Sequence, residues 1–238
     1  MLTELKKQVY EANMAIQRHK LAIFTWGNVS GIDRSKGLVV IKPSGVEYDA
    51  LSPIDLPVID VATGRVVEGD LNPSSDTATH LEIYRRFKDV GGVTHTHSEW
   101  ATIYAQAGRS IRPYGTTHAD YFGGEIPCTR PMTAEEISGK YELDTGKVIC
   151  ETFEKLNLDP MHIPAVLVHS HGPFTWGSDA MKSVENAITL DYVARLAYYT
   201  ESLIEIPNKP NMDNVLLHKH FDRKHGKNAY YGQKKKKK

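Results

Sequence analysis

Strand-like apolar runs alternate with segments of helical periodicity along the sequence, and this alternation limits the possible folds more than any other feature. Some of the expected strands form hairpins, whereas others stand between helices. Because of this mixture we expect an α/β domain in which helices cover a mixed or largely antiparallel sheet. The expected hairpins and single strands lie at 21–45, 56–70, 91–97, 124–132 and 164–171.

The expected helices are recognised by apolar spacing of three and four residues and by capping residues. Thr133 and Glu136 have the spacing of a capping box. In the longest helix an apolar stripe is expected along Met181, Val184, Ile188 and Tyr192. The expected helices lie at 2–16, 74–87, 98–108, 133–141, 145–157 and 178–203.

Composition and charge exclude several classes of protein. The chain has 238 residues, 40% hydrophobic and 24% charged, which suits one domain over residues 1–233. Zero formal net charge gives no reason to expect nucleic-acid binding. No signal-peptide pattern opens the chain, and no run reaches the ~18–20 apolar residues of a membrane span. With only two cysteines we expect a cytoplasmic protein, and we expect the lysine-rich tail 234–238 to be disordered.

Two His-X-His pairs stand at the ends of apolar runs: His95 with His97, and His169 with His171. Residues i and i+2 of a strand share one face, so each pair would present both imidazoles to the same side. Neutral imidazole is a preferred ligand of zinc and related divalent ions. A single histidine is more often structural, and the chain contains eleven. Two pairs in the same context nevertheless favour a metal site.

A carboxylate is the natural further ligand, and Asp76 and Asp120 are the candidates. Asp76 begins a helical pattern and could instead cap that helix. Asp120 could be an ordinary turn aspartate, and spacing alone does not decide either case. A nucleophilic triad is not expected, because the sequence has no Gly-X-Ser-X-Gly motif and no cysteine beside a histidine.

Three turns combine glycine or proline with hydroxyl side chains, at 26–31, 42–45 and 72–76. Backbone NH groups and serine hydroxyls in such turns can hold a phosphate. None of the three matches a P-loop or a GxGxxG motif, so a nucleotide is not expected. Each alone is most simply a loop. Together with a metal site they favour a small phosphorylated substrate.

The complete set of segments resembles the L-ribulose-5-phosphate 4-epimerases, a family of the class II aldolase/adducin-like superfamily. The resemblance runs in order from residue 1 to about residue 233. It implies a three-layer α/β/α sandwich with a mostly antiparallel sheet, and a homotetramer with active sites between neighbouring subunits. The matching segments are FTWGNVSGID, IKPSGV, PSSDTATH, HTHSEWAT, GTTHADYF, IPCTR, VLVHSHGPFTWG and KHGKNAYYGQ.

The same resemblance implies ligands for the metal and for the substrate phosphate. It leaves His169 as a neighbour of the metal, and it implies Zn²⁺, although Mn²⁺ and Co²⁺ also accept such sites. The implied metal ligands are Asp76, His95, His97 and His171. The implied phosphate-binding residues are Gly27, Asn28, Ser44, Gly45, Ser74 and Ser75, with Lys42 close by.

The resemblance also implies the acid/base groups, Asp120 and Tyr231, with Tyr231 coming from an adjacent subunit. Its supporting residues are Glu142, His220 and Arg223. One departure from the family pattern is Gly123, where tyrosine is expected.

The implied activity interconverts L-ribulose 5-phosphate and D-xylulose 5-phosphate by cleaving C3–C4, rotating the glycolaldehyde phosphate and adding it back. Because the two proton transfers occur on opposite faces of the aldehyde, Asp120 and Tyr231 are expected on different sides of the metal. One alternative is a fuculose or rhamnulose 1-phosphate aldolase, for which the family pattern has Glu in place of Asp76. Another is a non-catalytic adducin-like interaction module. Arabinose and ascorbate routes both use the epimerisation, and the sequence favours neither.

Overall fold

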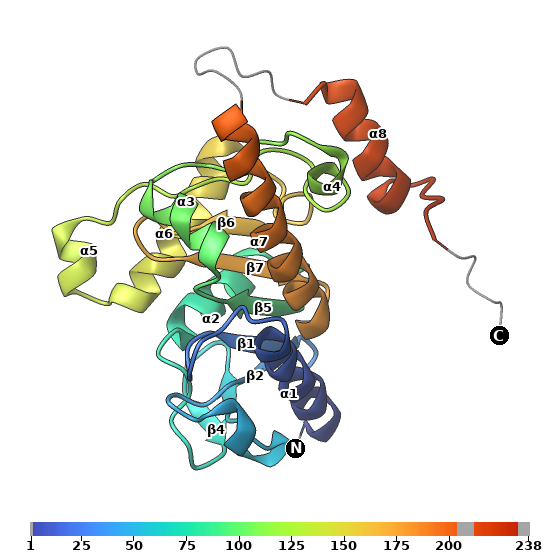
Figure 1. Cartoon of the computed structure of the whole chain (residues 1–238). Helices are drawn as coiled ribbons and strands as arrows, with labels where there is room; N and C mark the ends of the chain where they lie inside the picture. The colour runs from blue at the N-terminus through green and yellow to red at the C-terminus, as the bar shows by residue number, and fades with distance from the viewer. Residues whose placement is uncertain (1, 204–211, 233–238) are drawn as a thin grey trace.

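A computed structural model describes residues 2–203 and 212–232. Its strands form a seven-stranded sheet in the order β4-β3-β2-β1-β5-β7-β6, and each neighbouring pair is antiparallel (Figure 1). The expected antiparallel sheet is therefore confirmed. The strands are β1 (Asn28–Asp33), β2 (Leu38–Ile41), β3 (Val58–Asp60), β4 (Val66–Glu68), β5 (Gly92–His95), β6 (Ala165–Leu167) and β7 (Pro173–Gly177).

Helices cover both faces of this sheet, which confirms the three-layer architecture. Helices α2 and α6 pack on one face, and α1, α3 and α7 pack on the other. The helices are α1 (Thr3–Arg18), α2 (Thr77–Arg86), α3 (Glu99–Gln106), α4 (Thr116–Ala119), α5 (Ala134–Ser138), α6 (Tyr141–Leu156), α7 (Ala180–Leu203) and α8 (Asn214–His225), with 3-10 turns η1 (Tyr48–Ala50) and η2 (Pro53–Asp55).

The alternation of strand side chains explains the two separate cores. Val39 and Ile41 of β2 point to the α2/α6 face, whereas Val40 between them points to α1 and α7. Each of these three side chains is completely buried. Full burial of such a side chain stabilises the fold by about 1.5–3 kcal/mol. The central strands are therefore held from both faces, which gives the loops at their ends a rigid support.

One segment that was expected to be a strand is not, and another is a strand only in its first half. Residues 124–132 make only single bridges, Ile126 with Ile111 and Cys128 with Leu167, and prolines at 127 and 131 lack the NH that a ladder needs. Strand β6 ends at Leu167, so residues 169–171 form a turn rather than a strand face. Ser170 in that turn has a positive φ of 59°.

The expected stripe on α7 is only half buried, and helix α8 was not predicted. Val184 is fully buried and Ile188 packs against the core, whereas Met181 and Tyr192 are 38% and 53% exposed. Small side chains make up much of the rest of the buried face. The buried residues of α7 are Ala180, Ser183, Val184, Asn186, Ala187, Leu190, Val193, Ala194 and Ala197.

Helix α8 lies beside α4, away from the sheet (Figure 1). It begins at an N-cap, where the Asp213 carboxylate accepts hydrogen bonds from the NH groups of Val215 and Leu216. The predicted lysine-rich tail 234–238 falls outside the described residues. Among the described helices, none is both long and apolar enough to cross a membrane.

Candidate metal centre and phosphate-binding loops

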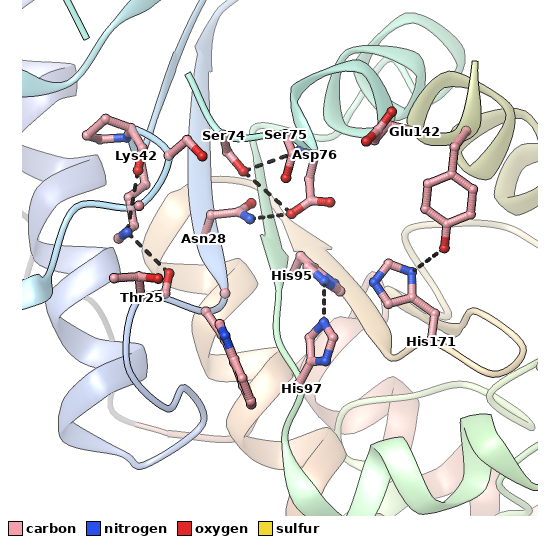
Figure 2. Close-up of a pocket in the computed structure, with 16 residues that line it drawn as sticks. Thr25, Asn28, Lys42, Ser74, Ser75, Asp76, His95, His97, Glu142 and His171 are labelled. Atoms are coloured by element: carbon pink, nitrogen blue, oxygen red, sulfur yellow. Dashed lines mark hydrogen bonds between the residues drawn. The ribbon is translucent and has the colours of Figure 1, made fainter. Parts of the chain in front are cut away.

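Three histidines from two separate parts of the sheet converge at one point. His95 ends β5, His97 follows two residues later, and His171 lies in the turn between β6 and β7. One ligand nitrogen from each lies within 4.8 Å of the other two. The Nε2 atoms of His95 and His97 are only 3.1 Å apart (Figure 2). Adjacent pairing of β5 with β7 brings the two His-X-His motifs together.

Neighbouring groups fix the orientation of the imidazoles. The Nδ1–H of His95 donates to the carbonyl of Pro173 at 3.0 Å, an assignment that leaves Nε2 with a free lone pair. The His95 ring also stacks on Phe174 with centroids 4.2 Å apart. Hydrogen bonds of this kind from the second nitrogen usually orient metal-binding histidines. The His169 side chain does not join the other three. It packs against Gly108 instead, where an added Cβ would lie only 2.6 Å from its Nε2.

The surroundings favour the neutral form of the three imidazoles, of which His95 is buried, His171 partly buried and His97 exposed at the cavity. Burial lowers the pKa of His95 to about 3. The pKa of His97 is lowered by burial, and that of His171 by burial and by the neighbouring His97. Unprotonated nitrogens are what a divalent cation requires. The cluster therefore presents free lone pairs at neutral pH.

Asp76 lines the same cavity as the three histidines. It precedes α2, but its side chain makes no capping hydrogen bond. Instead its Oδ2 accepts from Asn28 Nδ2 at 2.7 Å and lies 3.5 Å from Ser74 Oγ. Burial alone would raise the pKa of Asp76, but the nearby imidazoles, His95 first, and the Asn28 hydrogen bond lower it. Three imidazoles and one carboxylate are a donor set that fits a divalent metal ion.

A cavity of about 550 Å³ joins this cluster to the small-residue turns. The backbone of these turns needs glycine, because Gly27 and Gly45 have φ values of 76° and 68°. A Cβ on Gly27 would also lie 3.1 Å from the carbonyl oxygen of His95. The residues that the sequence analysis assigned to phosphate binding and that line the cavity are Gly27, Asn28, Lys42, Ser44, Gly45, Ser74 and Ser75.

Lys42 is a buried cation beneath these turns, with 1% of its surface exposed. Its ammonium donates to the carbonyl of Val46 at 2.7 Å. It also donates to the carbonyls of Thr25 and Pro43, each at 3.4 Å (Figure 2). It also lies 4.8 Å from the Tyr48 ring centroid. Burial lowers its pKa to about 8. Lys42 therefore ties two turns together and gives the cavity a positive charge.

Five residues were assigned to proton transfer and its support. Glu142 lines the cavity, but the other four lie away from it. Asp120, His220, Arg223 and Tyr231 form a cluster where α4 meets α8, and none of them lines the cavity. Arg223 donates to both oxygens of Asp120, at 3.0 and 2.7 Å, and its guanidinium lies 4.9 Å from the Tyr231 ring centroid. Asp120 and Tyr231 thus flank the same cation.

Asp120 is a carboxylate at neutral pH. Burial alone would raise its pKa, but hydrogen bonds from Arg223 and His220 lower it. Tyr231 is 61% exposed, so its hydroxyl faces away from the core. Gly123 is close to this cluster, because a Cβ there would lie 3.3 Å from the carbonyl oxygen of His162 and 3.4 Å from the Phe221 ring of α8.

Tyr141 and Glu142 enter the cavity from the first turn of α6. The Thr79 hydroxyl anchors this turn by donating to the carbonyl of Glu142 at 2.5 Å. The Tyr141 hydroxyl lies 3.5 Å from Nδ1 of His171. Sequence reasoning identified Glu142 but missed Tyr141, because an isolated tyrosine at a helix start carries no distinguishing pattern.

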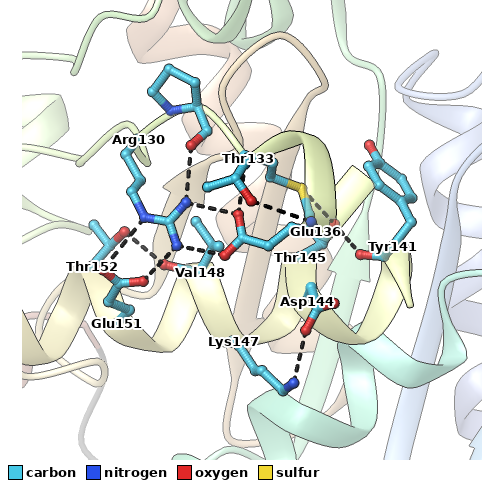
Figure 3. Close-up of polar contacts among 12 residues, drawn as sticks. Arg130, Thr133, Glu136, Tyr141, Asp144, Thr145, Lys147, Val148, Glu151 and Thr152 are labelled. Carbon is cyan, nitrogen blue, oxygen red and sulfur yellow. Dashed lines mark hydrogen bonds and ion pairs between the residues drawn. The ribbon is translucent and has the colours of Figure 1, made fainter. Parts of the chain in front are cut away.

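The arm that leads into this turn is held by ion pairs rather than by a core. Residues 131–140 contain no buried side chain. Arg130 pairs with both oxygens of Glu136, at 2.9 and 2.7 Å, and with Glu151 at 2.9 Å (Figure 3). The hydrogen bonds from Arg130 lower the pKa of Glu136 to about 2. The expected capping box of Thr133 and Glu136 is present.

Comparison with known proteins identifies the scaffold. The family model of the class II aldolase and adducin N-terminal domain matches residues 7–198. An L-fuculose 1-phosphate aldolase has a TM-score of 0.75 at 22% identity, covering 92% of this chain and 96% of that chain. YgbL from Escherichia coli, a candidate aldolase, epimerase or decarboxylase, has a TM-score of 0.70 at 20% identity, with 92% and 98% covered. At these identities the structural likeness shows a shared fold.

Proposed function

Because the chain belongs to the class II aldolase and adducin N-terminal domain family, we propose that it is a metal-dependent epimerase acting on L-ribulose 5-phosphate and D-xylulose 5-phosphate. One observation carries the proposal: a single cavity is lined by three imidazoles with a carboxylate, and by serine- and glycine-rich turns above a buried lysine. The imidazoles and the carboxylate suit a metal ion that sugar oxygens chelate. The serine- and glycine-rich turns and the lysine suit a phosphate.

The proposed metal ligands are His95, His97 and His171, with Asp76 beside them. A bound divalent cation would act as a Lewis acid on the C2 and C3 oxygens of the ketopentose. Zinc fits the imidazole-rich donor set, and manganese or cobalt would also be accepted. The phosphate is held by the turns around Gly45 and by the hydroxyls of Ser44, Ser74 and Ser75.

The reaction must break a carbon–carbon bond, because the C4 hydrogen is not α to the C2 carbonyl. The C3–C4 bond breaks and its electron pair stays on C3, in the enediolate of dihydroxyacetone. The C4 hydroxyl gives its proton to a base, and C4 becomes the aldehyde carbon of glycolaldehyde phosphate. After the aldehyde rotates, C3 attacks its other face, and the new C4 alkoxide takes up a proton.

Asp120 and Tyr231 are the proposed proton-transfer groups. They do not line the cavity of their own chain, so the proposal requires a neighbouring subunit of a homotetramer to bring them to it. Since Arg223 contacts both side chains, we infer that one neighbour supplies the pair together, with His220 in support. This arrangement departs from the expectation that the two groups stand on different sides of the metal. Asp120, held as a carboxylate, suits the base, and the phenol of Tyr231 suits the acid. Glu142 supports from the cavity's own subunit.

The competing function is an aldolase, since L-fuculose 1-phosphate aldolases share the fold. The side chain at position 76 favours the epimerase. An aspartate that is hydrogen-bonded to Asn28 at 2.7 Å is held back against the wall of the cavity, where it serves poorly as a mobile base. An aldolase would also release its aldehyde, whereas an epimerase must keep it.

The test is incubation of the metal-loaded protein with L-ribulose 5-phosphate. We expect D-xylulose 5-phosphate to form, chelation to abolish this activity and zinc to restore it. Little free glycolaldehyde phosphate should appear. Stoichiometric release of the aldehyde would assign an aldolase instead, and failure to form any epimer would refute the proposal. His97→Asn should lose metal and activity together, and light scattering should report a tetramer; an active monomer would contradict the shared site.

A further inference from the structure

An exposed tryptophan stands at the rim of the candidate site. Trp26 is 51% exposed, and it lines the cavity beside Gly27. Ile23 and Phe24 next to it are 56% and 71% exposed. Large aromatic side chains normally bury most of their surface. A tryptophan left half in solvent at the rim of a cavity is therefore available to a ligand.

The structure holds this tryptophan in place although it does not bury it. The hydroxyl of the buried Tyr48 donates to the carbonyls of Trp26 and Gly27, at 2.8 and 3.1 Å. The backbone NH of Trp26 donates to the backbone carbonyl of Ile23 at 3.0 Å. The Phe24 ring meets the indole edge-on, with centroids 5.7 Å apart and an interplanar angle of 80°. The indole thus stands on a fixed backbone.

Its position connects the two halves of the site. Trp26 precedes Gly27, which belongs to the phosphate-binding turns, and its ring lies 6.1 Å from the His97 ring at 45°. Trp26 and Tyr141 are the large aromatic residues, other than histidine, that line the cavity in the described part of the chain. Tyr141 approaches from the side of His171, so Trp26 is the large aromatic residue of the lining that adjoins Gly27.

We propose that the Trp26 indole covers the phosphorylated aldehyde fragment and prevents its escape between bond cleavage and bond formation. This inference rests on the proposed epimerase function. After cleavage the aldehyde is held only by its phosphate, while it has to rotate. The polar side chains of the cavity leave the C1–C2 portion of the fragment open to water. A rigid apolar surface over it allows rotation, because it makes no directional hydrogen bond with the carbonyl.

The decisive measurement is the amount of free glycolaldehyde phosphate released per epimer formed, read with a carbonyl-trapping reagent. Trp26→Ala should raise this ratio on the order of tenfold, equivalent to about 1.4 kcal/mol. Trp26→Phe, which keeps a ring, should raise it less. Ile23→Ala is the matched control, since the Ile23 side chain is exposed near Trp26 without lining the cavity, and its hydrogen bond with Trp26 uses only the backbone. Its ratio should equal that of the wild type. An unchanged ratio in Trp26→Ala overturns the inference while leaving the epimerase function intact.

A second measurement does not depend on turnover. Glycolaldehyde phosphate added to the metal-loaded wild type should quench tryptophan fluorescence, and Trp26→Phe should abolish the change, because Trp176 is fully buried and Trp100 does not line the cavity. If no epimer forms, the proposed function fails, but the fluorescence measurement still tests whether the Trp26 indole contacts glycolaldehyde phosphate. Absence of quenching, or its persistence in Trp26→Phe, overturns the inference. A third outcome would assign the indole to a subunit interface instead. In that case the Trp26→Ala variant dissociates in light scattering, and the wild type shows no quenching.

Discussion

Replacement of Lys42 by methionine should remove a pH-dependent destabilisation of the folded chain. The pKa of the Lys42 ammonium is lowered from 10.5 to about 8, chiefly by burial. At pH 7 the lysine is protonated in both the folded and the unfolded chain, so the full cost of burying the charge is present. Between about pH 8 and 10.5 the unfolded chain binds more protons, and the free energy of unfolding therefore rises with pH.

The size of the effect follows from the two pKa values. The interval from about 8 to 10.5, at about 1.4 kcal/mol per pH unit, corresponds to about 3 kcal/mol. Urea unfolding of wild type and Lys42→Met from about pH 7 to about pH 10 measures it. The wild type should gain stability relative to Lys42→Met across this range, by an amount that approaches the full value only near pH 10.5. Other titrating groups cancel in this difference.

Lys36→Met is the control, because Lys36 is exposed and pairs with Asp33 at 3.0 Å. It tests whether loss of any lysine charge produces the same trend. A stability difference between wild type and Lys42→Met that stays constant with pH would refute the reasoning. Phosphate binding offers a second measurement of the Lys42 charge. The affinity of the protein for phosphate should fall as pH rises through about 8, where Lys42 loses its charge.

Three further predictions concern the site and the core. Asn28→Ala should weaken zinc affinity about 10–100-fold in a chelator competition, because it removes the hydrogen-bond donor to Asp76 at 2.7 Å. Ser44→Ala should leave zinc affinity unchanged, and equal losses in the two variants would contradict the role of Asn28. Asp120→Asn should lower turnover about 10²–10⁴-fold with unchanged metal content, and wild-type turnover would exclude it as a base. Trp176→Ala should cost about 3–5 kcal/mol in urea unfolding, since Trp176 is fully buried and donates to Pro160 at 2.7 Å; a cost typical of a surface change would contradict this packing.

Much of the fold could be predicted because local patterns and tertiary packing agree. The hairpin turning at Thr63 and Gly64 and the capping box at Thr133 are encoded within a few residues. The buried face of α7 could not be found in this way. Six of its nine buried residues are alanine, serine or asparagine, which carry little hydrophobic signal, while Tyr192 on the exposed side carries a strong one.

The candidate site shows the same division between local and tertiary information. Strand periodicity correctly paired His95 with His97, but it also suggested that His169 and His171 share a face. That inference failed because the strand ends at Leu167, and the turn with Ser170 at positive φ separates the two side chains. The contact between Asn28 and Asp76 spans 48 residues and arises only after the sheet forms.

The separate docking of α8 bears on how this scaffold can change over evolutionary time. Met212 and Leu217 pack with Ala119 in a small cluster of their own, outside the cores on the two faces of the sheet. Substitutions in residues 212–232 therefore leave the main sources of stability untouched. A gene lineage can exchange the proposed proton donor Tyr231, and the Arg223 and His220 side chains that hold Asp120, while it inherits the proposed metal ligands and phosphate turns unchanged. New reactions can then arise on an old binding site without passing through unfolded intermediates.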